Sequence, residues 1–291
     1  MTDMPDAAGL IAFQGEPGAY SDLACREVYP DLKTLACGTF EETIAAVRDG
    51  KAALAMLPIE NSVAGRVADI HHLMPDSGLS IIGEHFQRVN HHLLALPGAT
   101  LAGLKTVRSH IQALSQCRAF LRRHGLAAHV AADTAGAAAE IAARGDTTVA
   151  AIASELAGQI YRLQSLAQNI EDEEHNTTRF LVMAREPRPL PPDCAKAVTT
   201  FVFRVRNVPA ALYKAMGGFA TNGVNMTKLE SYMLGGRFTA TQFYADVEGK
   251  PEDTSLRLAL EELRFFTAEV KILGTYPAHP FRAEAAQAAG D

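Results

Sequence analysis

The chain has 291 residues, of which 48% are hydrophobic and 21% charged, as in a soluble globular protein of two or three domains. The formal net charge is -6 and no basic run occurs, which argues against a nucleic-acid partner. An anionic ligand would therefore have to be attracted by a local site and not by the whole surface.

The sequence carries no signal for secretion or membrane insertion. The N-terminal residues MTDMPDAAGL lack the basic-then-apolar pattern of a signal peptide, and no apolar run approaches the roughly 18–20 residues of a membrane span. The four cysteines are widely spaced and form no CxxC pair. They predict reduced thiols, not disulfides, in a cytoplasmic protein.

Two pairs of adjacent histidines raise the question of a metal site. Neighbours in a helix point about 100° apart and neighbours in a strand point to opposite faces, so neither His71-His72 nor His91-His92 makes a chelating face by itself. No HExxH or CxxC motif accompanies them. We expect no metal.

Short apolar strand patterns alternate with helical patterns over the first 170 residues. Strands are expected at 10–15, 33–38, 52–59, 80–86, 91–96, 105–110, 127–132 and 148–153. Helices are expected at 20–28, 41–49, 66–74, 112–124 and 134–144. This alternation predicts an α/β architecture of parallel sheets covered on both faces, and the length favours two linked lobes over one wide sheet.

The pattern changes after a proline-rich segment, EPRPLPPDC at 186–194, which reads as a linker. Strands are then expected at 197–205, 224–233, 238–248 and about 268–274, and helices from Pro209 to about Ala220 and at about 252–265. Gly235-Gly236 indicates a hairpin between the second and third strands. The order βαββαβ is the ferredoxin-like plan, and we expect no regular structure in the tail after Pro280.

Polar residues stand at several junctions between strands and helices. They are Ser21, Thr39, Glu60, Asn61, Ser62, Ser109 and Ser154. Each junction alone is explained by N-capping, and Thr39 with Glu42 has the spacing of a capping box. Together they indicate a ligand site, because strand C-termini and helix N-termini share one edge of a parallel sheet and favour anions there. Gly15 and Gly18 would let backbone amides approach such an anion.

Two further features bear on that site. Gln112 and Gln116 are four residues apart and stack on one helix face, so that Gln116 could reach a ligand at the helix start; the alternative is a solvated face. Arg179 stands in front of a buried strand, where its planar guanidinium suits a carboxylate, or it snorkels at the surface. In a regular strand Arg179 shares one face with Thr177, and Thr178 shares the other with Phe180.

The stretches IAFQGEPGAYSDLA, LPIENSVAGRV, SHIQALSQC and NTTRF, in this order, resemble the catalytic domain of the prephenate dehydratase family. The downstream βαββαβ segment resembles the regulatory ACT domain of that family, and the match covers about residues 9–277. The resemblance implies a two-lobed catalytic domain like type II periplasmic binding proteins at 9–187, with one lobe at 9–84 and 168–187 and the other at 88–167. A linker at 188–195, an ACT domain at 196–277 and a flexible tail at 278–291 complete the expected organisation.

The resemblance also implies a function. The family converts prephenate to phenylpyruvate, water and carbon dioxide in L-phenylalanine biosynthesis, and it needs no cofactor. By this resemblance Thr178 is the catalytic threonine, which bonds to the departing hydroxyl. Glu60 is our candidate for the acid, because it is the nearest carboxyl among the motifs. Arg179 would pair a carboxylate and Phe180 would pack against the ring. The expected substrate-binding residues are Ser21, Asn61, Ser62, Ser109, Gln116, Asn176, Thr177, Arg179 and Phe180.

By the same resemblance, the ACT-like segment would bind L-phenylalanine as effector and join the chains into a homodimer or homotetramer, together with the catalytic domains. The expected effector-binding residues are Ala211, Leu212, Asn225, Met226, Thr227, Leu229 and Glu230. The family motifs GALV and ESRP appear here as Pro209–Leu212 and Glu230–Met233. The alternative is a module that only dimerises.

Two other functions fit the same residues. An arogenate dehydratase would apply this chemistry to the amino-acid counterpart of prephenate. A non-catalytic sensor of amino acids or keto acids would only bind, which Thr178 beside Glu60-Asn61 argues against. No chorismate mutase segment precedes residue 9, so we expect a monofunctional chain.

Overall fold

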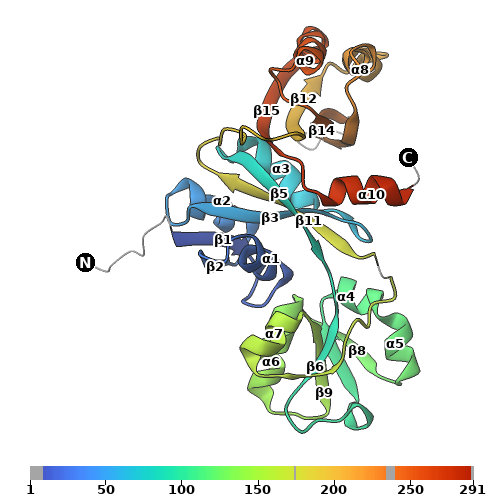
Figure 1. The fold of residues 1–291 in the computed structure, drawn as a ribbon. Helices are drawn as coiled ribbons and strands as arrows, with labels where there is room; N and C mark the ends of the chain where they lie inside the picture. Colours follow the sequence, from blue (N-terminus) through green and yellow to red (C-terminus); the bar gives the residue numbers. More distant parts are fainter. Residues whose placement is uncertain (1–8, 174, 234–239, 290–291) are drawn as a thin grey trace. The chain divides into compact units, whose positions relative to one another are not determined.

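The computed structural model describes residues 9–173, 175–233 and 240–289 (Figure 1). It divides into two compact units, one of residues up to 70 together with 85–180, the other of residues 71–84 together with those from 181 onward. Strands β5 (Ser80–Arg88) and β11 (Thr177–Ala184) contribute residues to both units. Our domain boundaries therefore stay predictions. None of the described helices is long and apolar enough to cross a membrane.

The N-terminal sheet has the strand order β2-β1-β3-β11-β5, with β4 paired to β3. Its other strands are β1 (Leu10–Gln14), β2 (Lys33–Cys37), β3 (Leu54–Asn61) and β4 (Gly65–Arg66), and the accompanying helices are α1 (Tyr20–Val28), α2 (Phe40–Arg48) and α3 (Ala68–Leu73), followed by the 3-10 turn η2 (Met74–Asp76). Strand β1 pairs in parallel with β2 and β3. The NTTRF segment opens β11, which returns to this sheet between β3 and β5, as expected.

The second sheet has the order β10-β6-β9-β7-β8. Its strands are β6 (His92–Ala95), β7 (Thr106–Ser109), β8 (Ala127–Val130), β9 (Val149–Ala153) and β10 (Gln164–Ala167), after the 3-10 turn η3 (Leu101–Gly103). Its helices are α4 (Ile111–Gln116), α5 (Arg118–Arg123), α6 (Thr134–Arg144) and α7 (Glu155–Tyr161). Leu93, Val107 and Ile152 are fully buried in its core.

The structure corrects three expectations for this region. The second sheet is not wholly parallel, because β6 runs antiparallel to β9 and β10. The expected helix 112–124 is divided at Cys117, whose φ of -121° is not helical. Strands β4 and β10 were not predicted, because GR and QSLA contain no apolar run that would mark a strand.

The C-terminal unit contains an antiparallel sheet of order β13-β14-β12-β15. Its elements are β12 (Ala197–Val205), α8 (Ala211–Thr221), β13 (Met226–Met233), β14 (Ala240–Glu248), α9 (Thr254–Phe266) and β15 (Thr267–Pro277), which confirms the order βαββαβ. Phe201, Phe219 and Leu260 join the sheet and its two helices in one core. Helix α8 begins two residues after Pro209, because Ala210 adopts φ 60°. Gly235-Gly236 lies outside the described residues.

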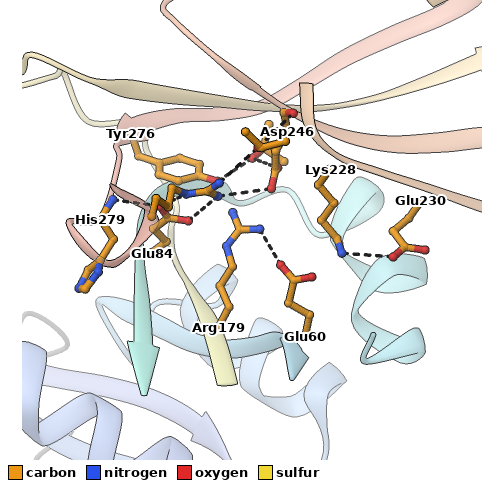
Figure 2. A network of polar contacts seen from close by, with 11 residues as sticks. Glu60, Glu84, Arg179, Lys228, Glu230, Asp246, Tyr276 and His279 are labelled. Carbon is orange, nitrogen blue, oxygen red and sulfur yellow. Dashed lines mark hydrogen bonds and ion pairs between the residues drawn. The ribbon is translucent and has the colours of Figure 1, made fainter. Parts of the chain in front are cut away.

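The sequence predicts no regular structure after Pro280, and this prediction is wrong. The tail forms helix α10 (Phe281–Ala289). Arg282 on this helix donates two hydrogen bonds to Glu84, of 2.6 and 2.9 Å, and lies 3.7 Å from Asp246. Figure 2 shows the two carboxylates, Glu84 and Asp246. The side chains of both carboxylates are fully buried. A buried charge is tolerated only when it is paired, so these contacts anchor the helix. They were not predictable, because Glu84 and Asp246 lie far from Arg282 in the sequence.

The four cysteines are free thiols. Cys25 and Cys117 are buried, and burial raises the pKa of both thiols.

Candidate active site

A cavity of about 500 Å³ lies in the N-terminal unit. It is lined where β1 leads into α1, where β3 turns into β4, and at the starts of α4 and α6. Strand β11 contributes Thr178 and Phe180. This is the edge of strand ends and helix starts at which the sequence predicts a ligand site.

The cavity brings together five of the predicted catalytic and substrate-binding residues: Ser21, Asn61, Gln116, Thr178 and Phe180. The six that lie outside its lining are Glu60, Ser62, Ser109, Asn176, Thr177 and Arg179. The strand alternation of β11 explains part of this division, because Thr177 and Arg179 point away from the face that carries Thr178 and Phe180.

Ser62 and Ser109, which we predicted to bind substrate, form hydrogen bonds within the protein instead. The Ser109 hydroxyl donates to the carbonyl of Ile152 at 2.6 Å and is fully buried. The Ser62 hydroxyl donates to the carbonyl of His175 at 2.7 Å and accepts from the amide of Thr177 at 2.9 Å. Ser62 therefore fastens the loop after β3 to the start of β11.

Arg179 meets a partner inside the protein. Its Nη1 lies 3.0 Å from Glu60 Oε1 (Figure 2). Its guanidinium lies 5.9 Å from the centroid of the Phe86 ring. Its side chain is 3% exposed and that of Glu60 is 30% exposed. The charge that seemed to call for a substrate carboxylate is thus met by Glu60, on the face of β11 that the cavity does not use.

Thr178 is held by an amide whose orientation the backbone determines. Asn61 Oδ1 accepts the amide hydrogens of Val63 and Ala64, at 2.9 and 2.7 Å, so its Nδ2 must point the other way. That nitrogen donates to Thr178 Oγ1 at 3.0 Å and to Asn176 Oδ1 at 2.8 Å. Because the Thr178 oxygen accepts this bond, its own proton can be donated to an acceptor in the cavity.

A second group of polar side chains continues from Asn176, which is 1% exposed. Asn176 Nδ2 donates to Gln116 Oε1 at 2.9 Å, and that oxygen lies 2.9 Å from His91 Nε2. On the far side of the ring, His91 Nδ1 lies 3.0 Å from the Tyr20 hydroxyl, which also donates to the carbonyl of Asn90 at 2.6 Å. Hydrogen bonds therefore run without a break from Thr178 to Tyr20.

Burial sets the protonation of this group. Burial, assisted by the negative charge of Glu171, raises the pKa of Tyr20 well above its usual value, so the phenol keeps its proton. Burial lowers the pKa of His91, against the opposing effects of the Gln116 bond and of Glu171. The imidazole is therefore neutral at pH 7.

The cavity contains one positively charged side chain that the sequence analysis did not single out. Arg66 on β4 is the only arginine or lysine among the described residues of the lining. Tyr20 and His91 were missed as well. Tyr20 and Arg66 stand inside the stretches that carry the family resemblance, which was the available signal, whereas His91 was considered only as a metal ligand.

The glycine amides do not serve as expected. Gly15 donates its amide hydrogen to the carbonyl of Cys37 at 3.0 Å, and Gly18 donates to Asp22 Oδ2 at 2.8 Å. Gly18 has φ +90°, and a Cβ there would lie 2.7 Å from Cα of Ala157. Glycine is needed at 18 for close packing against α7 and not for an anion.

The predicted effector residues lie in the C-terminal unit, but not on one surface. Along β13 exposure alternates, so Thr227 and Leu229 share the exposed face while Met226 and Glu230 share the other. Glu230 pairs with Lys228 at 3.2 Å (Figure 2). The remaining predicted residues are Ala211 and Leu212 at the start of α8, which pack against the core, and Asn225 just before β13.

Tyr232 shows what the departure from the ESRP motif does in this strand. Its hydroxyl accepts from Gln242 Nε2 at 2.8 Å, and its ring contacts His71 and His72. The first histidine pair is thus part of an aromatic cluster. The described residues contain no group of three or more His, Cys, Asp or Glu that could hold a metal ion.

Comparisons with a family model and with known proteins agree on one family. The model of the family described as "Prephenate dehydratase" matches residues 11–188. A bifunctional N-acyl-homoserine lactone acylase/prephenate dehydratase from Komagataeibacter europaeus is 56% identical, over 94% of this chain and 97% of its own length. An arogenate dehydratase/prephenate dehydratase from Arabidopsis thaliana is 38% identical, over 95% of this chain and 74% of its own.

Solved structures agree. One described as a novel type of quorum-quenching acylase is 56% identical, with a TM-score of 0.88 over 94% of this chain and 99% of that one. The prephenate dehydratase of Arthrobacter aurescens, solved in complex with L-Phe, is 29% identical, with a TM-score of 0.84 over 97% of this chain and 96% of that one. This chain belongs to the prephenate dehydratase family.

Proposed function

We propose that the cavity binds prephenate and that the chain converts it to phenylpyruvate, water and carbon dioxide. The observation that carries this proposal is the hydrogen bond from Asn61 Nδ2 to Thr178 Oγ1, which uses the threonine oxygen as an acceptor and leaves its proton available for a ligand in the cavity. A sensor that only binds would not need a donor fixed in this way. Relatives named arogenate dehydratases, such as one from Petunia hybrida at 37% identity, make arogenate the second substrate to assay.

The reaction needs oriented donors and little covalent chemistry. The C–O bond to the ring hydroxyl and the C–C bond to the ring carboxylate both break, the electron pair of the latter completes the aromatic ring, and carbon dioxide leaves. The departing hydroxyl takes up a proton and becomes water. Thr178 donates a hydrogen bond to that oxygen as its charge develops, where a preorganised donor stabilises the transition state more than the ground state.

Two neighbouring residues complete the proposed site. Phe180, which is 1% exposed and lines the cavity beside Thr178, packs against the ring of the substrate. Arg66 supplies the guanidinium that pairs a substrate carboxylate, the role that the sequence alone suggested for Arg179. Glu60 then acts as the partner of Arg179 and not as the acid.

Thr178→Val should lower kcat on prephenate by about 10²-fold or more, the usual cost of one transition-state donor, because valine keeps the shape and removes the hydroxyl. Phenylpyruvate absorbance measures turnover directly. The same change at Thr177, on the opposite face of β11, should cost less than about tenfold, since that side chain lies outside the lining. Equal losses at both positions would contradict the assignment.

Arg66→Lys should raise KM for prephenate about tenfold, because an ammonium cannot reproduce the two parallel bonds of a guanidinium to a carboxylate. Arg179→Lys is the matched variant, and it should leave KM near the wild-type value while lowering the thermal midpoint. Steady-state kinetics and thermal unfolding of both variants separate the two arginines. The reverse pattern would return the substrate carboxylate to Arg179.

We also propose that the C-terminal βαββαβ unit acts as an ACT domain, binds L-phenylalanine and joins the chains into a cytoplasmic homodimer or homotetramer. The Arthrobacter aurescens relative that was solved with L-Phe, 29% identical over 97% of this chain, supports the effector. Thr227 and Leu229 lie exposed on β13, where a ligand or a second chain can reach them.

L-phenylalanine should release or take up heat on titration and should lower the rate of prephenate turnover, because an effector that binds one state better shifts the population toward it. Calorimetry and the phenylpyruvate assay, with L-alanine as the control ligand, check both effects. No heat together with unchanged rates would leave the unit as a dimerisation module.

The relatives favour a second activity, hydrolysis of N-acyl-homoserine lactones. The Komagataeibacter europaeus protein is named for that acylase and is 56% identical over 94% of this chain, which runs against our expectation of a monofunctional chain. The reaction would add water across the amide, giving a carboxylic acid and homoserine lactone.

Incubation of the purified chain with an N-acyl-homoserine lactone should release homoserine lactone, detected by mass spectrometry. Excess prephenate should slow that release if both reactions use the cavity at Thr178. A preparation that turns over prephenate but releases no homoserine lactone would exclude the acylase.

A further inference from the structure

The orientation of Asn61 determines the orientation of the next two amides. Asn61 Nδ2 is a donor, so the atom of Asn176 that faces it at 2.8 Å must be the oxygen. The nitrogen of Asn176 then faces Gln116 at 2.9 Å, and the atom that receives it must again be an oxygen. Neither amide can be flipped without setting two donors or two acceptors against each other.

This fixed direction dictates which nitrogen of His91 carries a proton. Gln116 Oε1 lies 2.9 Å from His91 Nε2, and a carbonyl oxygen only accepts, so Nε2 must be protonated. In the neutral ring Nδ1 is then bare and accepts a share of the single Tyr20 proton at 3.0 Å, since the phenol also donates to the Asn90 carbonyl at 2.6 Å. The backbone amides of Val63 and Ala64 thus set a tautomer three side chains away.

We propose that His91 is a positioning residue for the dehydration, acting on Thr178 through Gln116, Asn176 and Asn61. Its Nε2–H holds the carbonyl of Gln116, which in turn holds the amide nitrogen of Asn176. With these bonds intact, Asn176 Oδ1 stays on Asn61 Nδ2 and steadies the nitrogen that donates to Thr178 Oγ1. The inference rests on the proposed function of the cavity.

These hydrogen-bonded side chains can position Thr178 because His91 and Asn176 are buried. His91 is 2% exposed and Asn176 is 1% exposed, so the bonds that these two side chains make are largely shielded from solvent. Removing the His91 donor leaves the Gln116 carbonyl with one bond fewer, so Gln116 and Asn176 can turn. Asn61 stays oriented by Val63 and Ala64, but its Nδ2 then loses Asn176 as a partner and holds Thr178 less firmly. Amides do not pass protons along, so His91 orients Thr178 and does not feed it a proton.

Substitutions at His91 test the role. His91→Leu removes the donor and should lower kcat by about tenfold to a hundredfold, the range for residues that orient a functional group through another residue. KM should change by less than about threefold. His91→Gln keeps an N–H donor near the position of Nε2 and should restore kcat to within about threefold of wild type. The adjacent His92, bonded to Ser165 at 3.2 Å, provides the matched control: His92→Leu should leave kcat within about twofold.

A double-mutant cycle separates positioning from general damage. If His91 acts through Thr178, then His91→Leu should change kcat by less than about twofold in the Thr178→Val background, because the group it orients is already gone. Losses that multiply would overturn the proposal, as would a His91→Gln variant no better than His91→Leu.

The tautomer can be read without turnover. Nitrogen-15 spectra of histidine-labelled wild-type protein at pH 7.5, with the His91 signals identified by their loss in His91→Gln, should show a protonated Nε2 and a bare Nδ1. The opposite tautomer would overturn the chain of bonds. This measurement needs no substrate, so it tests the tautomer independently of the proposed function. A wild-type chain that is inactive on prephenate would refute the proposed function but would not affect the result for the tautomer.

Discussion

Two backbone N–H groups, those of Val63 and Ala64, are the constraint on which the catalytic side of this protein depends. They bind Asn61 Oδ1 at 2.9 and 2.7 Å and leave its nitrogen only one direction. An amide side chain has nearly the same shape in both orientations, so sterics alone would not choose between them. Main-chain donors do choose, because turning the amide would set its nitrogen against two N–H groups.

The consequences spread across both sheets of the N-terminal unit. Asn61 ends β3, Thr178 belongs to β11, Gln116 ends α4 and His91 immediately precedes β6, so hydrogen bonds join elements that are distant in the sequence. Such a network is stable only when every member is satisfied. Here the side-chain carbonyls of Asn61, Asn176 and Gln116 each face a donor, and the amide nitrogens of Asn61 and Asn176 face acceptors. The threonine hydroxyl is the end of the network that can contact a ligand.

Strand β11 shows how much of this site the sequence could predict. Its alternation correctly separates Thr178 and Phe180 from Thr177 and Arg179, and the family resemblance correctly names the family. The identity of the face that meets the cavity was not predictable, because it depends on Glu60 being beside Arg179 in the neighbouring strand. His91 was missed because its contacts with Gln116 and Tyr20 cross the fold, whereas Arg66 stands within a motif of the family resemblance and could have been singled out.

The fold also contains elements that the sequence predicts well and elements that it does not. The long periodic elements α1, α2, α6 and α9 lie within about two residues of prediction, because a 3.6-residue period over several turns is a strong signal. The short strands β4 and β10 and the break at Cys117 escaped, since two to four residues carry no period.

Helix α10 escaped for an electrostatic reason. Its sequence, FRAEAAQAA, has no apolar stripe, so pattern alone predicts a frayed end. Arg282 instead binds Glu84 and Asp246, whose side chains are wholly buried, and it also donates to Thr227 at 3.2 Å. Separating one guanidinium from two buried carboxylates costs several kcal/mol, so α10, β5 and β14 are held together as one body.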